Sequence, residues 1–155
     1  MKRTLPLLFW TFLCLHLLTA AYARQFVGLP SSALIGEGGV TQFAGIQVGT
    51  YELGNRLGLR ANAEFVPMPD NGPVAHGGVD LLYRGGESNI FYAGVGGGYA
   101  SVAGNDSLYL AGTAGVDFDA ASRISYFLEV QPHYDLVREE SLLYLRSGIN
   151  VHFGD

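Results

Sequence analysis

The chain is poor in the residues that carry thiol and basic chemistry. Its one cysteine (Cys14), its one tryptophan (Trp10) and its only lysine (Lys2) all lie in the first 23 residues. Residues 24–155 therefore allow no disulfide and no thiol chemistry. They contain seven arginines against all 14 acidic residues, a formal charge of −7. This excess of negative charge argues against nucleic acid as a partner and against docking on an anionic lipid surface.

Long apolar runs are also absent, except at the start of the chain. There, two basic residues precede an apolar run, Leu5–Leu18, and the motif Ala21-x-Ala23 follows. This order predicts a secretory signal peptide over residues 1–23, cleaved before Arg24. The run is short for a membrane-spanning helix, which needs roughly 20 residues. Residues 24–155 have the length of one domain.

No stretch after the signal peptide sustains helical periodicity; apolar and polar residues alternate instead. Turn signals rich in Gly, Asn, Asp and Pro separate the alternating segments, and Pro67–Pro73 is the richest of these turns. The alternation predicts eight strands, over Phe26–Ile35, Thr41–Tyr51, Arg56–Val66, Val74–Arg84, Asn89–Val102, Ser107–Phe118, Ile124–Val137 and Leu142–Phe153. Strands joined by short hairpins are antiparallel, and closing the sheet removes its exposed edges. The sequence thus predicts an all-β, eight-stranded, antiparallel up-and-down barrel.

Three residues are unusual inside predicted β-strands. Gly28 and Pro30 interrupt the first segment, so the alternation leaves open whether residues 26–35 form a full strand. Pro132 lies inside the seventh segment, where it removes a ladder hydrogen bond. We expect a β-bulge at Pro132, near the outer rim of the barrel. The turn before the seventh segment is expected over Asp119–Arg123.

Periodicity alone does not tell the inside of a barrel from the outside, and the aromatic residues favour one answer. On the apolar face they fall at the two ends of the strands, with small aliphatic residues between. Phe91 and Tyr99 are eight residues apart, which corresponds to roughly 20 Å along the axis of a tilted strand, close to the apolar band of about 25 Å in membrane barrels. The predicted aromatic girdle consists of Phe65, Tyr83, Phe91, Tyr99, Phe118, Tyr126, Tyr134 and Phe153. A soluble, periplasmic, lipocalin-like barrel that binds an apolar ligand stays as the alternative.

The opposite face of the strands is polar and is expected to line the lumen. An eight-stranded interior is just wide enough for side chains, so these residues should pair with one another and fill it. The predicted polar network consists of Arg60, Glu64, His76, Asp80, Arg84, Asp117, Glu129, His133, Asp135 and Arg146. Asn62, Gln131, Asn150 and His152 are expected on the same side.

The sequence predicts no catalytic, cofactor-binding or metal-binding residue. His76, His133 and His152 are isolated in the sequence and lack the spacing of metal ligands. His133 and Asp135 imitate a base and its orienting group, as a lipid A-modifying barrel enzyme would need. Strand periodicity places both inside the barrel, however, so an enzyme is the weaker alternative.

The last strand carries the most specific motif. In Leu142–Phe153 the residues Arg146, Gly148, Val151 and Phe153 resemble the C-terminal recognition signal of bacterial outer-membrane barrels. The chain departs from that signal in ending on Gly154-Asp155, because the aromatic residue usually comes last.

Residues 24–155 as a whole resemble the small eight-stranded outer-membrane barrels of the OmpA-transmembrane-domain and OmpX kind. The resemblance implies an outer-membrane location in a Gram-negative-type envelope, contact with outer-membrane lipid and insertion by the barrel assembly machinery. Barrels of this kind serve as anchors, adhesins, small channels or lipid-modifying enzymes; for this chain we expect a structural or interaction role without a cofactor, and the oligomeric state stays open. Fold alone does not fix function.

Overall fold

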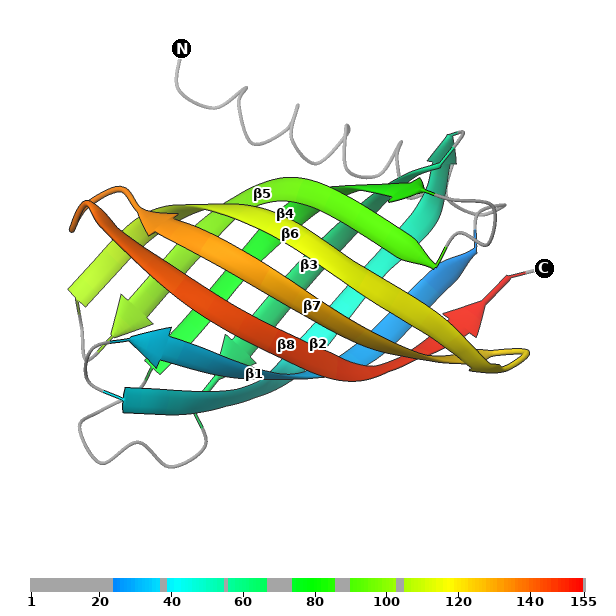
Figure 1. Cartoon of the computed structure of the whole chain (residues 1–155), viewed down its shortest axis with the longest axis horizontal. Helices are drawn as coiled ribbons and strands as arrows, with labels where there is room; N and C mark the ends of the chain where they lie inside the picture. The colour runs from blue at the N-terminus through cyan, green and yellow to red at the C-terminus, as the bar shows by residue number, and fades with distance from the viewer. Residues whose placement is uncertain are drawn as a thin grey trace, which may run out of the picture.

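The computed structural model describes residues 24–36, 39–54, 56–66, 74–85, 90–102 and 105–154. Within them, eight antiparallel strands follow one another around a closed barrel, and β1 pairs with β8 (Figure 1). The strands are β1 (Gln25–Gly36), β2 (Gly39–Gly54), β3 (Leu57–Phe65), β4 (Val74–Gly85), β5 (Phe91–Val102), β6 (Asn105–Ala121), β7 (Ile124–Asp135) and β8 (Glu140–Phe153). The predicted eight-stranded barrel is confirmed. The predicted signal peptide and the Pro67–Pro73 turn lie outside the described residues.

Side chains alternate between the lumen and the exterior, because successive residues of a strand point to opposite sides. Along β3 and β7, buried and exposed residues alternate without interruption. The exposed positions are apolar: Val95 is 67% exposed and Leu128 is 58% exposed. This is the reverse of a lipocalin-like barrel, and for the described strands it contradicts the soluble alternative. No helix long and apolar enough to cross a membrane occurs among the described residues.

The two ends of the barrel differ in which parts of the chain they hold. β1 begins and β8 ends at the same end, on the right in Figure 1. We call this end the terminal rim; it also carries the connections that follow β2, β4 and β6. The opposite rim carries the connections that follow β1, β3, β5 and β7.

The predicted bulge at Pro132 is wrong. Strands β6 and β7 keep one register on both sides of the proline, with Ala111 opposite His133 and Ala114 opposite Val130. Pro132 is exposed on the exterior. The ladder with β6 is therefore interrupted there without an inserted residue. A proline lacks the N–H group that a bond to β6 would need, and the strand accommodates that loss locally.

The bulge of this strand pair lies at the terminal rim instead, where the register shifts between Asp119 and Ala121. Strand β6 consequently runs into the stretch Asp119–Arg123 that the sequence predicts as a turn. The doubt about the first strand is also resolved, because β1 is continuous through Gly28 and Pro30. Both residues stay in register with β8.

Glycines on the lumen side make room for large side chains, and this gives a testable contrast within β6. A Cβ atom at Gly115 would lie 2.6 Å from the Tyr92 hydroxyl and 2.8 Å from Glu129 Cβ. At Gly112, on the exterior, it would meet only Pro132 Cγ at 3.5 Å. We expect Gly115→Ala to lower the free energy of unfolding by about 1–3 kcal/mol through overpacking.

Gly112→Ala is the matched control and should leave the free energy of unfolding nearly unchanged. Urea titration in phospholipid vesicles, followed by circular dichroism, measures both variants. Equal effects of the two substitutions would contradict the assignment of Gly115 to a packed lumen.

Candidate functional site in the barrel lumen

The exterior presents aromatic residues at two levels, with aliphatic side chains between them. All eight predicted girdle residues are exposed there. Near the terminal rim lie Tyr83, Phe91, Phe118, Tyr126 and Phe153, and near the opposite rim lie Phe65, Tyr99 and Tyr134. Aromatic rings at these two levels are typical of barrels that cross a bilayer.

All ten residues predicted for the polar network point into the lumen. Nine are buried, and Arg84 is half-buried. The structure brings five of them into one central cluster, which we call the central network: Arg60, Glu64, Asp80, Glu129 and Arg146. The other five lie in smaller groups on either side of it.

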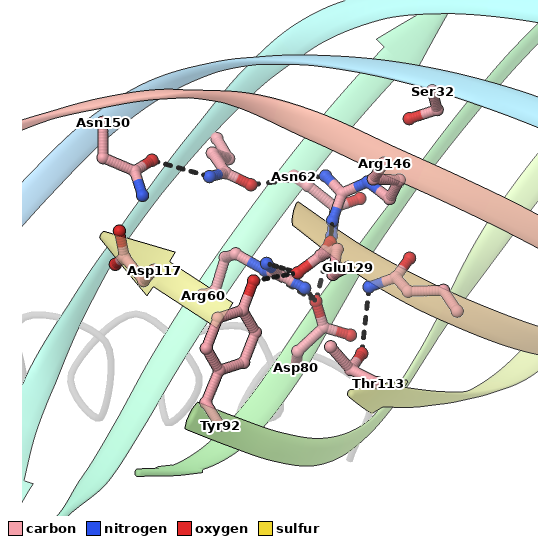
Figure 2. Close-up of polar contacts among 12 residues, drawn as sticks. Ser32, Arg60, Asn62, Asp80, Tyr92, Thr113, Asp117, Glu129, Arg146 and Asn150 are labelled. Carbon is pink, nitrogen blue, oxygen red and sulfur yellow. Dashed lines mark hydrogen bonds and ion pairs between the residues drawn. The ribbon is translucent and has the colours of Figure 1, made fainter. Parts of the chain in front are cut away.

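Glu129, from β7, links the two arginines of the central network (Figure 2). Its Oε2 accepts a hydrogen bond from Arg60 Nη1 at 2.7 Å and from the Tyr92 hydroxyl at 2.6 Å. Its Oε1 accepts from Arg146 Nη1. Because Arg60 comes from β3 and Arg146 from β8, the contacts cross the lumen.

Each arginine also binds a second carboxylate. Arg60 donates to Asp80 Oδ2 from Nε at 2.9 Å and from Nη2 at 2.7 Å. Arg146 donates from Nε to Glu64 Oε1 at 2.7 Å. Charge-assisted hydrogen bonds are among the strongest in proteins. They offset the large cost of removing the charges from water.

Other polar side chains also contact these charges. Ser32 donates its hydroxyl to Glu64, and Asn62 donates to Asp80 Oδ2 at 3.2 Å. His76 Nε2 lies 3.6 Å from Glu64 Oε2. With two arginines and three carboxylates, the central network has a formal charge of −1.

A second ion pair lies toward the terminal rim. Arg84 Nη2 donates to Asp117 Oδ2 at 3.0 Å. The Arg84 guanidinium also lies 4.0 Å from the centroid of the Tyr51 ring, which places a cation over an aromatic face. This pair is separate from the central network, although the sequence predicts one common network.

Asp135 caps a turn rather than joining the central network. Its Oδ1 accepts hydrogen bonds from the backbone N–H groups of Val137 at 2.9 Å and Arg138 at 3.0 Å. Its Oδ2 lies 3.5 Å from Arg138 Nη1. Asp135 therefore stabilises the β7–β8 connection at the opposite rim.

The histidines are less isolated than their spacing in the sequence suggests. The rings of His76 and His133 have centroids 6.0 Å apart. His133 stacks on Tyr109 at 4.4 Å and lies 4.3 Å from the Tyr144 ring. His76 and His133 are thus far apart in the sequence but neighbours in the lumen. Among the described residues, no three His, Cys, Asp or Glu side chains lie close enough together to hold a metal ion.

The structure also shows a serine–histidine pair that the sequence analysis does not predict. Ser125 Oγ and His152 Nε2 are 2.8 Å apart, and both residues are buried. His152 Nδ1 has no hydrogen-bond partner among the described residues, so no carboxylate orients the ring as in a catalytic triad. The pair joins β7 to β8, which register rather than sequence spacing brings together.

Aromatic side chains fill the lumen beside the charges, and these inward aromatics are absent from the predicted site. Phe26 and Tyr51 stack with centroids 4.5 Å apart toward the terminal rim. Phe127 is buried two residues from Glu129 on the same face of β7. This spacing could have identified Phe127 as a lumen residue, because residues two apart in a strand point to the same side.

The four residues of the predicted assembly signal divide between the two faces of β8. Arg146 is buried in the central network, and a Cβ at Gly148 would lie 2.7 Å from the Phe127 ring. Val151 and Phe153 are exposed on the exterior. Since β8 pairs with both β7 and β1, these residues lie in the strand that closes the barrel.

Comparison with known proteins shows similarity of structure without similarity of sequence. No family model matches the chain, and no curated protein matches its sequence. The N-terminal β-barrel domain of Pseudomonas aeruginosa OprF superposes with a TM-score of 0.65 at 14% identity, covering 85% of this chain and 98% of that one. Neisserial surface protein A (NspA) gives a TM-score of 0.55 at 12% identity, with 84% and 96% covered.

A barrel from a study titled "De novo design of transmembrane beta-barrels" gives a TM-score of 0.52 at 11% identity, covering 85% of this chain and 97% of the other. At such low identity the likeness concerns the fold alone. Together with the apolar exterior, it identifies the fold of this chain as that of the small eight-stranded transmembrane β-barrels of outer membranes.

Proposed function

We propose that this protein is an outer-membrane barrel with a closed lumen and a structural or interaction role in the cell envelope. The observation that carries the proposal is the cross-lumen bridge from Arg60 through Glu129 to Arg146, three residues that are each 1% exposed. An apolar exterior around this polar interior is the arrangement that a bilayer requires.

The packing of the lumen supports an anchor rather than a channel. The central network draws side chains from β3, β4, β7 and β8, so it spans the barrel. The Phe26–Tyr51 stack lies on its terminal side, and the His133–Tyr109 stack lies on the other side. Eight strands enclose little more space than such side chains fill.

The same burial weighs against the enzyme alternative. His133 and Asp135 face the lumen and are buried, and so is Ser107, with which Asp135 forms a hydrogen bond. Ser125 and His152 are in contact, but Ser125 has no exposed surface. A lipid substrate approaches from the exterior, where these groups are absent.

Two sequence motifs support export and assembly into the membrane. The signal peptide predicted over residues 1–23 would direct the chain across the inner membrane. The motif in β8 would then be recognised by the barrel assembly machinery. The connection between β3 and β4 is the longest in the barrel, so it is our candidate for contact with a partner outside the membrane.

Fractionation and conductance test this proposal together. We expect the protein in the outer-membrane fraction, with a gel mobility that changes on heating because the barrel resists detergent until heated. In planar bilayers, with a general porin as the positive control, we expect no stepwise current. Recovery as a soluble periplasmic protein would refute the membrane role, and regular conductance steps would refute the closed lumen.

A further inference from the structure

Two arginines stand apart from the others. Seven arginines follow residue 23, and five of them form ion pairs: Arg24, Arg60, Arg84, Arg138 and Arg146. Arg56 and Arg123 form none with the side chains that the structure describes. Both are exposed, whereas the arginines of the central network are buried.

Both of these arginines lie at the terminal rim, each directly before a strand. Arg56 precedes β3 and Arg123 precedes β7. Their backbones are tied to neighbouring strands, because Arg56 O accepts from Arg84 N at 2.8 Å and Arg123 O accepts from His152 N at 2.8 Å. The side chains therefore start from fixed points on the rim.

Arg56 holds its position in an unfavourable backbone conformation. Its φ of 74° falls in the left-handed region, where glycine is the favoured residue. Local backbone preference would favour glycine, and not arginine, at such a turn. This points to a role for the side chain itself.

Girdle aromatics are close to both positions in register or in sequence. Leu57, the residue after Arg56, pairs with Tyr83. Arg123 lies three residues before Tyr126 in the chain. Aromatic belts lie at the level of the lipid headgroups. An arginine just beyond the belt therefore lies at about the depth of the headgroup phosphates.

We propose that Arg56 and Arg123 bind the phosphodiester groups of phospholipid headgroups and so hold the terminal rim at the membrane interface. This inference rests on the membrane placement proposed above. A guanidinium group fits a phosphate through two parallel N–H···O bonds with donor–acceptor distances of about 2.7–2.9 Å. The contact needs a phosphate, not a net negative lipid.

The formal charge of −7 does not oppose a contact of this kind. That charge argues against a soluble protein adsorbing to an anionic surface, whereas an inserted barrel already holds its rim among headgroups. Internal carboxylates are the competing partners. For Arg56 the nearest in sequence is Glu52, whose side chain lies outside the described part of the chain; for Arg123 it is Asp119, which pairs with Arg24 at 3.4 Å.

Solid-state NMR can measure the contact directly. The protein is produced with ¹³Cζ-labelled arginine, purified from membranes and reconstituted in phosphatidylcholine bilayers. Rotational-echo double-resonance then reports dephasing of ¹³Cζ by lipid ³¹P, which requires close approach. The variants are R56Q/R123Q and, as the matched control at the opposite rim, R138Q.

We expect dephasing in the wild-type protein that falls to background in R56Q/R123Q and persists in R138Q. Arg60 and Arg146 serve as internal controls, because the barrel wall separates them from lipid. Dephasing that survives in R56Q/R123Q, or no dephasing from a folded, bilayer-inserted barrel, would overturn the inference. A chain that does not insert at all would refute the proposed function instead.

Discussion

Replacing Arg146 with leucine is expected to lower the free energy of unfolding by about 3–5 kcal/mol, the usual cost of leaving buried charges without their partner. Arg146 donates to Glu64 and Glu129, and all three side chains are almost fully buried. Without it, the central network holds one arginine against three carboxylates, and its formal charge falls from −1 to −2. Urea titration in phospholipid vesicles, followed by circular dichroism, measures the change.

Arg138→Leu is the matched control for this substitution. Arg138 also pairs with an aspartate, Asp135, but its side chain is 38% exposed at the rim, so we expect a change within about 0–1 kcal/mol. The double variant Arg146→Leu/Glu129→Leu should lower the free energy of unfolding by less than the sum of the two single variants. The reason is that the remaining Arg60, Asp80 and Glu64 carry a formal charge of only −1. Additive effects would show that packing, rather than the ion pair, explains the loss.

Placing a charge on the exterior of β7 is the second large effect that we expect. Val130 is exposed midway between Tyr126 and Tyr134, so it faces the centre of the apolar band. Val130→Arg should cost about 2–4 kcal/mol, because the bilayer core solvates a guanidinium poorly. The same urea titration in vesicles measures it.

The depth of the substitution separates a lipid-facing surface from a dry protein core. Leu136 is also exposed, but it lies beyond the end of β7 at the opposite rim. Leu136→Arg should therefore cost only about 0–1 kcal/mol, as is usual near the interface. If both substitutions cost the same, depth in a bilayer does not govern the exterior of this barrel.

Much of the fold was predictable from the alternation of apolar and polar residues alone. In β7 the alternation of Tyr126, Leu128 and Val130 with Ser125 and Glu129 predicts both the strand and its two faces. The direction of those faces came from the aromatic residues at the strand ends, since a period of two is the same for a soluble and a membrane barrel. The position of the bulge was not predictable. Pro132 suggested a bulge in β7, whereas the register of β6 and β7 shifts between Asp119 and Ala121.

The partners within the lumen were not predictable, because they depend on register around the closed barrel. Parity assigns Arg60, Glu129 and Arg146 to the lumen, but only the structure shows that Glu129 lies between the two arginines. The Ser125–His152 pair was not predictable for the same reason, because its two residues are on different strands. Phe26 and Phe127 alternate in step with the lumen residues, but an aromatic residue on a polar face is not a signal of a polar network, so the prediction does not include them.

A cysteine scan along β7 tests directly whether lipid contacts the apolar face of the strands while the polar face is enclosed. No cysteine follows Cys14, so each introduced cysteine is unique in the exported chain. Single cysteines from position 126 to position 133 are labelled with a small fluorophore while the chain is unfolded, and the chain is then refolded into vesicles that contain spin-labelled lipid. We expect strong quenching at positions 126, 128, 130 and 132 and weak quenching at 127, 129, 131 and 133. Quenching without this period of two, or with the opposite phase, would contradict this arrangement.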